Sequence, residues 1–396
     1  MKLTTHNKAI EKKVQAKAAI VTKIIAEELK PLSILMFGSF GKGEGTILNR
    51  KELFNDFDMY IITKKKVPDE ELDRVGKKAS AAIGMGGGEF IETDGQHYKR
   101  KQYFHVDLRA IPLSQVPKLK KTTRTYEIKN STQLLYGEDY RHLIDIEEKD
   151  LPLSEGWRHM INKSCLLLLA MDKRRFQGKF KDDEKLICMY YGLKTFMGCA
   201  ETLLLLKKRF SGSYRGRNAL FQQFYGKELP ALAKQVAFAT QMKCDFQPKK
   251  IKDVVAYWKE ARAALQFTID YIAKRALDIY TQDNITLMKK IYNKLPYHYH
   301  GPYLPIGKAG FPLQYGLNAL YYLRTKHTPA LMKWRDAGVR VWMPAFLLLY
   351  GIEDEHYLPA AEHYLKYLAP ITSKDFAGLR KATLYTYGKY YTQRLL

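Results

Sequence analysis

The chain of 396 residues is long enough for two or three domains, each with a hydrophobic core of ordinary size. Its composition, 46% hydrophobic and 27% charged, is typical of a globular protein and excludes a disordered one. The formal net charge of +25 favours polyanions or phosphorylated ligands as partners, although a lysine-rich, solvated surface explains it equally well.

Hydropathy and cysteine usage narrow the class of protein further. The longest apolar run begins at Val341, contains Pro344 and is too short to span a bilayer. The N-terminal segment carries too many charges for a signal peptide and has the pattern of an amphipathic helix. We therefore expect a cytoplasmic protein without a membrane partner. No cysteine has C-x-x-C spacing, so buried, reduced thiols are favoured over disulfides or a zinc site at Cys165, Cys188, Cys199 and Cys244.

The first 150 residues predict a mixed α/β domain. Apolar residues at helical spacing predict a helix over about 8–30, and the apolar run LSILMFG that follows predicts a buried strand. A second strand is expected in FDMYIIT, and a helix should begin after Pro68 and run to about Ile83. The other strand-like runs are EFIET and QYFHVDLRAI, interpreted as an antiparallel pair, and LLYG, interpreted as an edge element.

Helical periodicity dominates from Trp157 to the end of the chain. Long helical segments are expected over 157–176, 182–210 and 251–277, and a tyrosine-rich, loop-rich insert lies near residue 305. The predicted fold class is therefore α+β: an N-terminal mixed sheet with helices, followed by a mainly α-helical region. The expected domains are 1–150, 151–280 and 281–396.

Two aspartates lie at the start of the second predicted strand. Because side chains alternate along a strand, Asp56 and Asp58 should share one face, with Phe57 on the other. Two carboxylates this close repel each other unless a cation lies between them, and Mg²⁺ prefers carboxylate oxygens. Asp107, which lies in strand-like sequence, is the candidate for a third acid, and Mn²⁺ is the alternative metal.

A glycine-rich turn precedes the two aspartates. In FGSFGKGEG, backbone N–H groups near Gly38 could cradle a phosphate, with the Ser39 hydroxyl as a further donor and Lys42 as a nearby cation. The spacing excludes a P-loop, and no G-x-G-x-x-G dinucleotide fingerprint is present.

The order of these motifs resembles the DNA polymerase beta-like nucleotidyltransferase superfamily. Its signature hG[GS] matches Gly38-Ser39, its Dh[DE]h matches Asp56-Phe57-Asp58, and its later acid on a neighbouring strand matches Asp107. The likeness covers roughly residues 30–145. The spacer before Asp56 is longer than the commonest form of the family, which implies a loop insertion, TILNRKELF.

This resemblance implies a Mg²⁺-dependent transfer of an NMP from an NTP to an acceptor hydroxyl. Asp56 and Asp58 would bridge two metal ions, and Asp107 would bind the acceptor-side ion or, with one ion, act as general base. Gly38, Ser39 and Lys42 would bind the nucleotide. The acceptor oxygen would attack the α-phosphorus in line, and pyrophosphate would leave.

Several further residues are candidates with weaker support. His105 and Arg109 alternate with Asp107, so either could contact substrate or hold Asp107 in place. Glu89 and Glu92 could supply a base, and His298 and His300 could line an acceptor pocket. Basic clusters with interleaved aromatic residues are solvated helix ends or an acceptor-binding surface, and the candidates are Arg174, Arg175, Lys207, Lys208, Arg209, Tyr214 and Arg215.

The acceptor is left open by the sequence. A nucleic-acid 3′ end, such as that of tRNA, fits the positive charge and the basic–aromatic clusters. A small molecule, or a nucleotide as in second-messenger synthesis, fits the helical second half. A non-catalytic nucleotide- or RNA-binding protein of the same fold is the alternative of another class, and the oligomeric state is not predicted.

Overall fold

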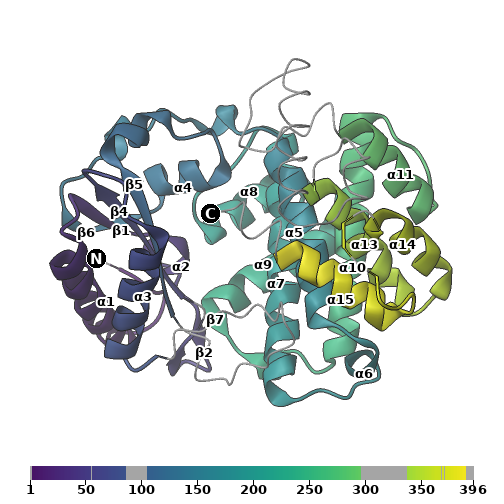
Figure 1. Ribbon diagram of the computed structural model, residues 1–396, viewed down its shortest axis with the longest axis horizontal. Coiled ribbons are helices and arrows are strands. Elements are labelled where there is room, and N and C mark those ends of the chain that lie inside the picture. The colour runs from purple at the N-terminus through teal and green to yellow at the C-terminus, as the bar shows by residue number, and fades with distance from the viewer. Residues whose placement is uncertain are drawn as a thin grey trace. The chain divides into compact units, whose positions relative to one another are not determined.

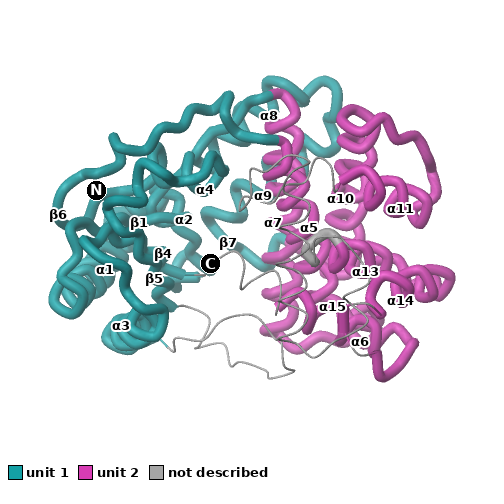
Figure 2. Tube along the Cα trace, turned by 45° about the horizontal axis from the view of Figure 1, so that its top comes forward, with its two compact units in different colours: residues 1–91, 97–152, 208–250 teal, residues 92–96, 153–207, 251–396 magenta. Residues whose placement is uncertain are grey.

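The structure is a computed structural model that describes residues 2–54, 56–85, 105–295 and 337–388, apart from 367 and 370 (Figure 1). It divides into two compact units (Figure 2). Unit 1 comprises residues 1–91, 97–152 and 208–250, and unit 2 comprises 92–96, 153–207 and 251–396. The fold is α+β, with an N-terminal mixed sheet and a mainly helical C-terminal region, which confirms the predicted class.

Unit 1 is built on a four-stranded sheet with the strand order β5-β4-β1-β6. The strand β4 pairs antiparallel with β1 and parallel with β5, and β6 pairs antiparallel with β1 at the edge. The predicted strands around the two aspartates and the LLYG edge element are thereby confirmed. The strands are β1 (Ser33–Met36), β4 (Asp56–Thr63), β5 (His105–Pro112) and β6 (Gln133–Gly137).

Two helices cover one face of this sheet: α1 (Lys8–Leu29) and α3 (Asp69–Ala82). The Asn7 side chain caps α1 by accepting from the Ile10 N–H, and α3 begins directly after Pro68 with three acids in its first turn. Both predicted helices are confirmed. Their apolar faces join the sheet in one buried core, which includes Val14, Val21, Ile25, Phe57, Met59, Leu72, Val75, Val106 and Leu108.

The segment TILNRKELF forms a hairpin rather than an irregular loop. Asn49 and Arg50 have φ values of 49° and 58°, and the Lys51 N–H donates to the Leu48 carbonyl (3.0 Å), so the turn has left-handed central residues. The strand β2 (Ile47–Leu48) pairs antiparallel with β3 (Glu52–Leu53) and parallel with β7 (Asp245–Phe246).

This second sheet brings residues 208–250 into unit 1, where they form α8 (Tyr214–Tyr225), α9 (Pro230–Cys244) and β7. The sequence-based division at residues 150 and 280 placed them in a helical domain, because their periodicity is helical and the two-residue strand β7 has no sequence signal. The three-part division itself remains a prediction. The other short elements of unit 1 are α2 (Gly38–Gly41), α4 (Thr123–Asn130) and 3₁₀ helices at Leu113–Lys118, Arg141–Leu143, Glu148–Asp150 and Pro248–Lys250.

All the regular secondary structure in the described residues of unit 2 is helical. Its helices bury tryptophans whose indole N–H groups find partners: Trp258 donates to the Leu167 carbonyl (3.0 Å) and Trp342 to the Ser164 hydroxyl (3.0 Å). The elements are α5 (Ser154–Ala170), α6 (Lys173–Phe176), α7 (Asp182–Leu206), α10 (Val254–Leu277), α11 (Asn284–Lys294), α13 (Ala337–Gly351), a 3₁₀ helix at Glu355–Tyr357, α14 (Leu358–Leu365) and α15 (Phe376–Tyr387).

All four cysteines are buried and free, as expected from their spacing. Among the helices described here, none combines the length and the apolar character that crossing a membrane requires. The predicted strand EFIET and the candidates Glu89, Glu92, His298 and His300 lie outside the described residues.

Candidate active site

The sheet face opposite α1 and α3 carries the predicted acids. Along β4, alternation places Asp56, Asp58 and Tyr60 on this face. The parallel register with β5 pairs Asp58 directly with Asp107, and Asp56 with His105. Neighbouring strands lie about 4.8 Å apart, so all three acids meet on two adjacent strands, as the sequence predicted.

The turn after β1 presses against the Asp58 carboxylate. Gly38 has a φ of 64°, and a Cβ atom at this position would lie 1.9 Å from Asp58 Oδ2. Only glycine permits both this conformation and this approach. The backbone fixes the same contact, because the Phe37 N–H donates to the Asp58 carbonyl (2.8 Å). Gly38 is therefore required where the carboxylate of Asp58 meets the turn.

Three polar atoms close to the predicted acids are buried and find no hydrogen-bond partner among the residues that the structure describes. They are Ser39 Oγ, Asp56 Oδ1 and His105 Nδ1. Leaving a buried polar atom unpaired costs about 1–3 kcal/mol, so such atoms in a native fold call for a specific explanation. A cation beside Asp56 and a phosphate beside Ser39 would supply one.

The electrostatics at Asp58 favour a cation beside its carboxylate. Burial, which is the largest cause, and the nearby carboxylates of Asp56 and Asp107 together raise the pKa of Asp58 to about 8, against the opposing charges of Arg109 and Lys42. Like charges crowded in a buried site favour the neutral acid. A divalent cation between these carboxylates would reverse that preference.

Asp107 is held by Arg109, two residues along the same strand. The Arg109 Nε and Nη2 atoms both donate to Asp107 Oδ2, at 3.3 and 3.1 Å. Of the two roles considered for Arg109, the structure shows the pairing role. Within the described ranges, no group of three His, Cys, Asp or Glu side chains is arranged as a ready metal site. Asp56 and Asp58 nevertheless fit as donors to a divalent ion, because the buried Asp56 Oδ1 has no partner among the described residues.

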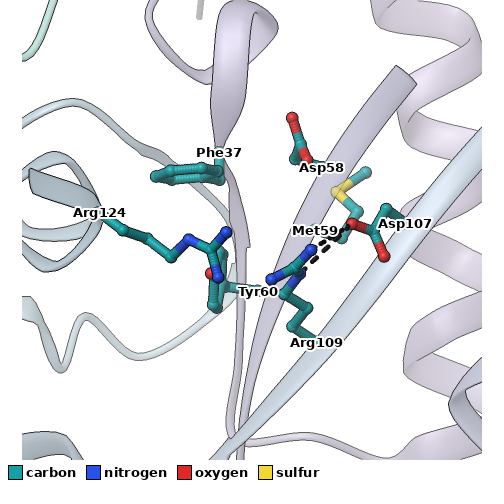
Figure 3. Close-up of a pocket in the computed structure, with 7 residues that line it drawn as sticks. All are labelled: Phe37, Asp58, Met59, Tyr60, Asp107, Arg109 and Arg124. Atoms are coloured by element: carbon teal, nitrogen blue, oxygen red, sulfur yellow. Dashed lines mark hydrogen bonds and ion pairs between the residues drawn. The ribbon is translucent and has the colours of Figure 1, made fainter. Parts of the chain in front are cut away.

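A small pocket of about 30 Å³ opens beside the acids. Figure 3 shows Asp58, Asp107 and Arg109 on neighbouring strands, with Arg124 reaching in from α4 towards Phe37 and Tyr60. Ligand pockets usually measure about 300–1,000 Å³, so this pocket has no room for a whole nucleotide. Sequence reasoning missed three of these residues. Alternation from Asp58 could have identified Tyr60, whereas no local signal marks Phe37 or Arg124.

Lys42, predicted to bind the nucleotide, is engaged by the protein itself. Its side chain is 3% exposed, and its Nζ lies 2.8 Å from Glu127 Oε2. The ammonium also contacts the Phe37 and Tyr214 rings, at 5.4 and 4.7 Å from their centroids. Gly38, Ser39 and the three acids thus lie together. The Lys42 ammonium instead binds Glu127 and contacts two aromatic rings.

The predicted acceptor-binding residues fall into two groups. In unit 2, Arg174 and Arg175 both bind the Glu184 carboxylate, at 2.5 and 3.1 Å, and although burial opposes it, these contacts lower the Glu184 pKa to about 2. Arg175 is buried and also donates to the backbone of α5. Arg174 is exposed despite its contact with Glu184. The other exposed charges of this set are Lys207 in unit 2 and Lys208, Arg209 and Arg215 in unit 1, where Tyr214 is half-buried.

Comparison with models of known protein families gives no match, and no curated protein matches. Among solved structures, the chain is similar to spectinomycin adenyltransferase AAD(9) from Enterococcus faecialis, determined with ATP and spectinomycin. The TM-score is 0.37 and the identity 14%, over 64% of this chain and 99% of that chain. A likeness this distant leaves the activity to be argued from the geometry of the site.

Proposed function

We propose that the protein is a Mg²⁺-dependent nucleotidyltransferase that moves an NMP from an NTP to an acceptor hydroxyl and releases pyrophosphate. The observation that carries this proposal is the meeting of three acids beside a glycine–serine turn. Asp58 and Asp107 are paired in register, Asp56 lies on the same face, and Gly38 contacts the Asp58 carboxylate.

Asp56 and Asp58 would hold the metal, with Mn²⁺ as the alternative ion. When bound, Mg²⁺ neutralises phosphate charge and polarises the reacting phosphorus. Asp107 is paired in register with Asp58 on the neighbouring strand, and Arg109 binds its Oδ2 atom. Asp107 would bind the acceptor-side ion or accept the proton of the acceptor hydroxyl. Arg109 fixes the orientation of this carboxylate.

Gly38 and Ser39 would hold the triphosphate through the backbone of the turn and the Ser39 hydroxyl. Support comes from the buried Ser39 Oγ, which has no hydrogen-bond partner among the described side chains and backbone groups. The positioning of both substrates next to fixed charges would supply most of the rate gain, as in other phosphoryl chemistry.

For the acceptor we propose an anionic molecule, either an RNA 3′ end or a nucleotide. The exposed charges of Lys207, Lys208, Arg209 and Arg215 and the net charge of +25 favour a polyanion. Arg174 and Arg175 support this role less, because Glu184 binds both. Loss of RNA binding as the salt concentration rises would favour RNA, and salt-insensitive turnover with mononucleotides would favour a nucleotide.

The test is release of pyrophosphate from each of the four labelled NTPs in the presence of Mg²⁺, with RNA and mononucleotide acceptors. We expect the Asp56→Asn, Asp58→Asn double variant to lose this activity. The matched control is Asp69→Asn, Asp73→Asn, which removes two exposed acids from α3. Full activity in the first variant refutes the proposal. NTP binding by the wild type without pyrophosphate release from any nucleotide supports the non-catalytic alternative.

A further inference from the structure

A charge cluster within unit 1 joins three segments that lie far apart in the sequence. Glu127, on α4, receives Lys42 Nζ at Oε2 and Arg217 Nη2 at Oε1, each at 2.8 Å. The side chains of Lys42, Glu127 and Arg217 are 3%, 11% and 6% exposed. Both carboxylate oxygens are thus occupied by cations, in surroundings nearly closed to water.

Aromatic rings complete the surroundings of the two cations. The Tyr214 ring contacts the Lys42 ammonium at 4.7 Å and the Arg217 guanidinium at 4.9 Å from its centroid. Phe37, the residue directly before the glycine–serine turn, contacts Lys42 from its own ring at 5.4 Å. Cation–π contacts of this kind are strongest when water is excluded. Lys42 is therefore stabilised where it lies, between protein groups.

A second link joins the same turn to α8. The Glu44 carboxylate accepts from the backbone N–H groups of Tyr214 (2.6 Å) and Arg215 (3.1 Å), in the first turn of that helix. The Glu44 N–H in turn donates to the Ser39 carbonyl (2.9 Å). An acid at a helix N-terminus is favourable both by hydrogen bonding and by the helix dipole. Residues 38–44 are thus attached to α8 at two points.

We propose that Arg217 is a positioning residue for the nucleotide, acting through Glu127 and Lys42 on the Gly38–Gly41 turn. This inference rests on the proposed nucleotidyl transfer and assigns Lys42 a role other than phosphate binding. Removing Lys42 from Glu127 to bind a phosphate would leave a buried carboxylate half-paired, which is strongly unfavourable. Lys42 instead holds the turn whose Gly38 meets Asp58 and whose Ser39 would meet the triphosphate.

The test is a set of dissociation constants for MgATP, MgGTP, MgCTP and MgUTP, measured by equilibrium titration. We expect Arg217→Met, Glu127→Gln and Lys42→Met each to weaken binding of the preferred nucleotide about 10- to 100-fold, because small displacements of positioning groups have effects of this size. Arg217→Lys should bind more tightly than Arg217→Met, because it keeps the charge opposite Glu127. The double variant Lys42→Met, Glu127→Gln should bind the nucleotide no more weakly than whichever of its two single variants has the lower affinity, because both residues act in one network.

The matched control is Arg74→Met, which removes an exposed arginine from its ion pair with Glu28 and should leave nucleotide affinity unchanged. Should Arg217→Met fail to fold, hydrogen exchange at the Gly38–Gly41 amides in folded Glu127→Gln gives the answer: faster exchange than in wild type supports the proposal, and unchanged exchange overturns it. Thermal unfolding of each variant separates lost stability from lost affinity.

Two results overturn the inference while leaving nucleotidyl transfer intact. One is wild-type affinity in folded Arg217→Met. The other is weak binding in Lys42→Met together with unchanged or tighter binding in Glu127→Gln, as expected if Lys42 contacts phosphate directly. Failure of the wild-type protein to bind any of the four nucleotides overturns the proposed function and this inference together.

Discussion

The two faces of the four-stranded sheet differ in character: one is apolar and packs against helices, and the other carries charged and polar side chains. On one face, Phe57, Met59 and Ile61 of β4 are fully buried and pack with the apolar sides of α1 and α3. On the other face, one residue away in each case, β4 carries Asp56, Asp58 and Tyr60, and β5 carries His105, Asp107 and Arg109. The first face is apolar and closely packed, whereas the second holds polar atoms, such as Asp56 Oδ1, that have no hydrogen-bond partner among the described residues.

The residues that stabilise the sheet therefore lie on one face, and the candidate ligand-binding residues lie on the other. Burial of large apolar side chains contributes roughly 1.5–3 kcal/mol each, and the core face has many of them. That gain offsets the cost of crowding like charges on the opposite face. Variants on the core face should therefore change stability, and variants on the acidic face should change ligand binding and its pH dependence.

The largest expected effect is on the core face. Phe57→Ala removes a fully buried ring between the two aspartates and should lower the free energy of unfolding by about 3–5 kcal/mol. Urea denaturation measures this, with Tyr136→Ala, a truncation of an exposed aromatic residue on β6, as the control. A loss no larger than that of the control would mean that this face is not the stabilising one.

The acidic face should behave in the opposite way. The Asp58 pKa lies near 8, above the ordinary value of 3.8, so the metal-free folded protein binds the extra proton and loses stability as pH rises from about 4 through 8. Asp58→Asn should match wild type near pH 4 and below, and exceed it near pH 9 by on the order of 5 kcal/mol. Thermal unfolding across this range measures the difference.

Added Mg²⁺ gives a second test of the same account. It should raise the unfolding temperature of wild type, most of all above pH 8, and should raise that of Asp58→Asn only slightly. Asp73→Asn, which changes an exposed acid on α3, serves as the control. Parallel stability curves for wild type and Asp58→Asn at every pH would contradict the electrostatic account of the site.

Gly38 lies in the turn after β1, against the Asp58 carboxylate. Gly38→Ala introduces a Cβ that would clash with Asp58 Oδ2 and adopts an unfavourable positive φ. We expect a loss of about 1–3 kcal/mol in stability and loss of NTP binding, measured by denaturation and nucleotide titration. Gly84→Ala has a similar positive φ with no neighbour within 4 Å, so it isolates the backbone cost. Equal NTP affinity in the two variants would argue against a role for the turn.

The smallest effect is expected on the acidic face away from the acids. Leu134→Ser changes a residue 36% exposed on β6, in the row of Leu35 and Tyr60. Its stability should stay within about 0.5 kcal/mol of wild type, with unchanged NTP affinity. Urea denaturation and titration provide the check. A larger change would show that the functional surface extends to the sheet edge.

Local patterns in the sequence determined much of unit 1. Helical spacing and a proline located α1 and α3, apolar runs located β1 and β4, and period-two alternation placed Asp56 and Asp58 on one face. The D-x-D pair and the glycine–serine turn predicted the candidate site before any contact was known. Such features are readable because hydrophobic periodicity and turn chemistry act between residues close in the chain.

Tertiary structure alone decided the remainder. The pairing of β2 with β7, the arrival of Arg124 beside Tyr60, and the diversion of Lys42 to Glu127 and Arg217 each join residues tens to hundreds of positions apart. The sequence around a basic residue near a glycine turn has the same pattern whether that residue binds a phosphate or a buried carboxylate. Which of these it meets depends on long-range packing, because only the folded chain brings the competing partner within reach.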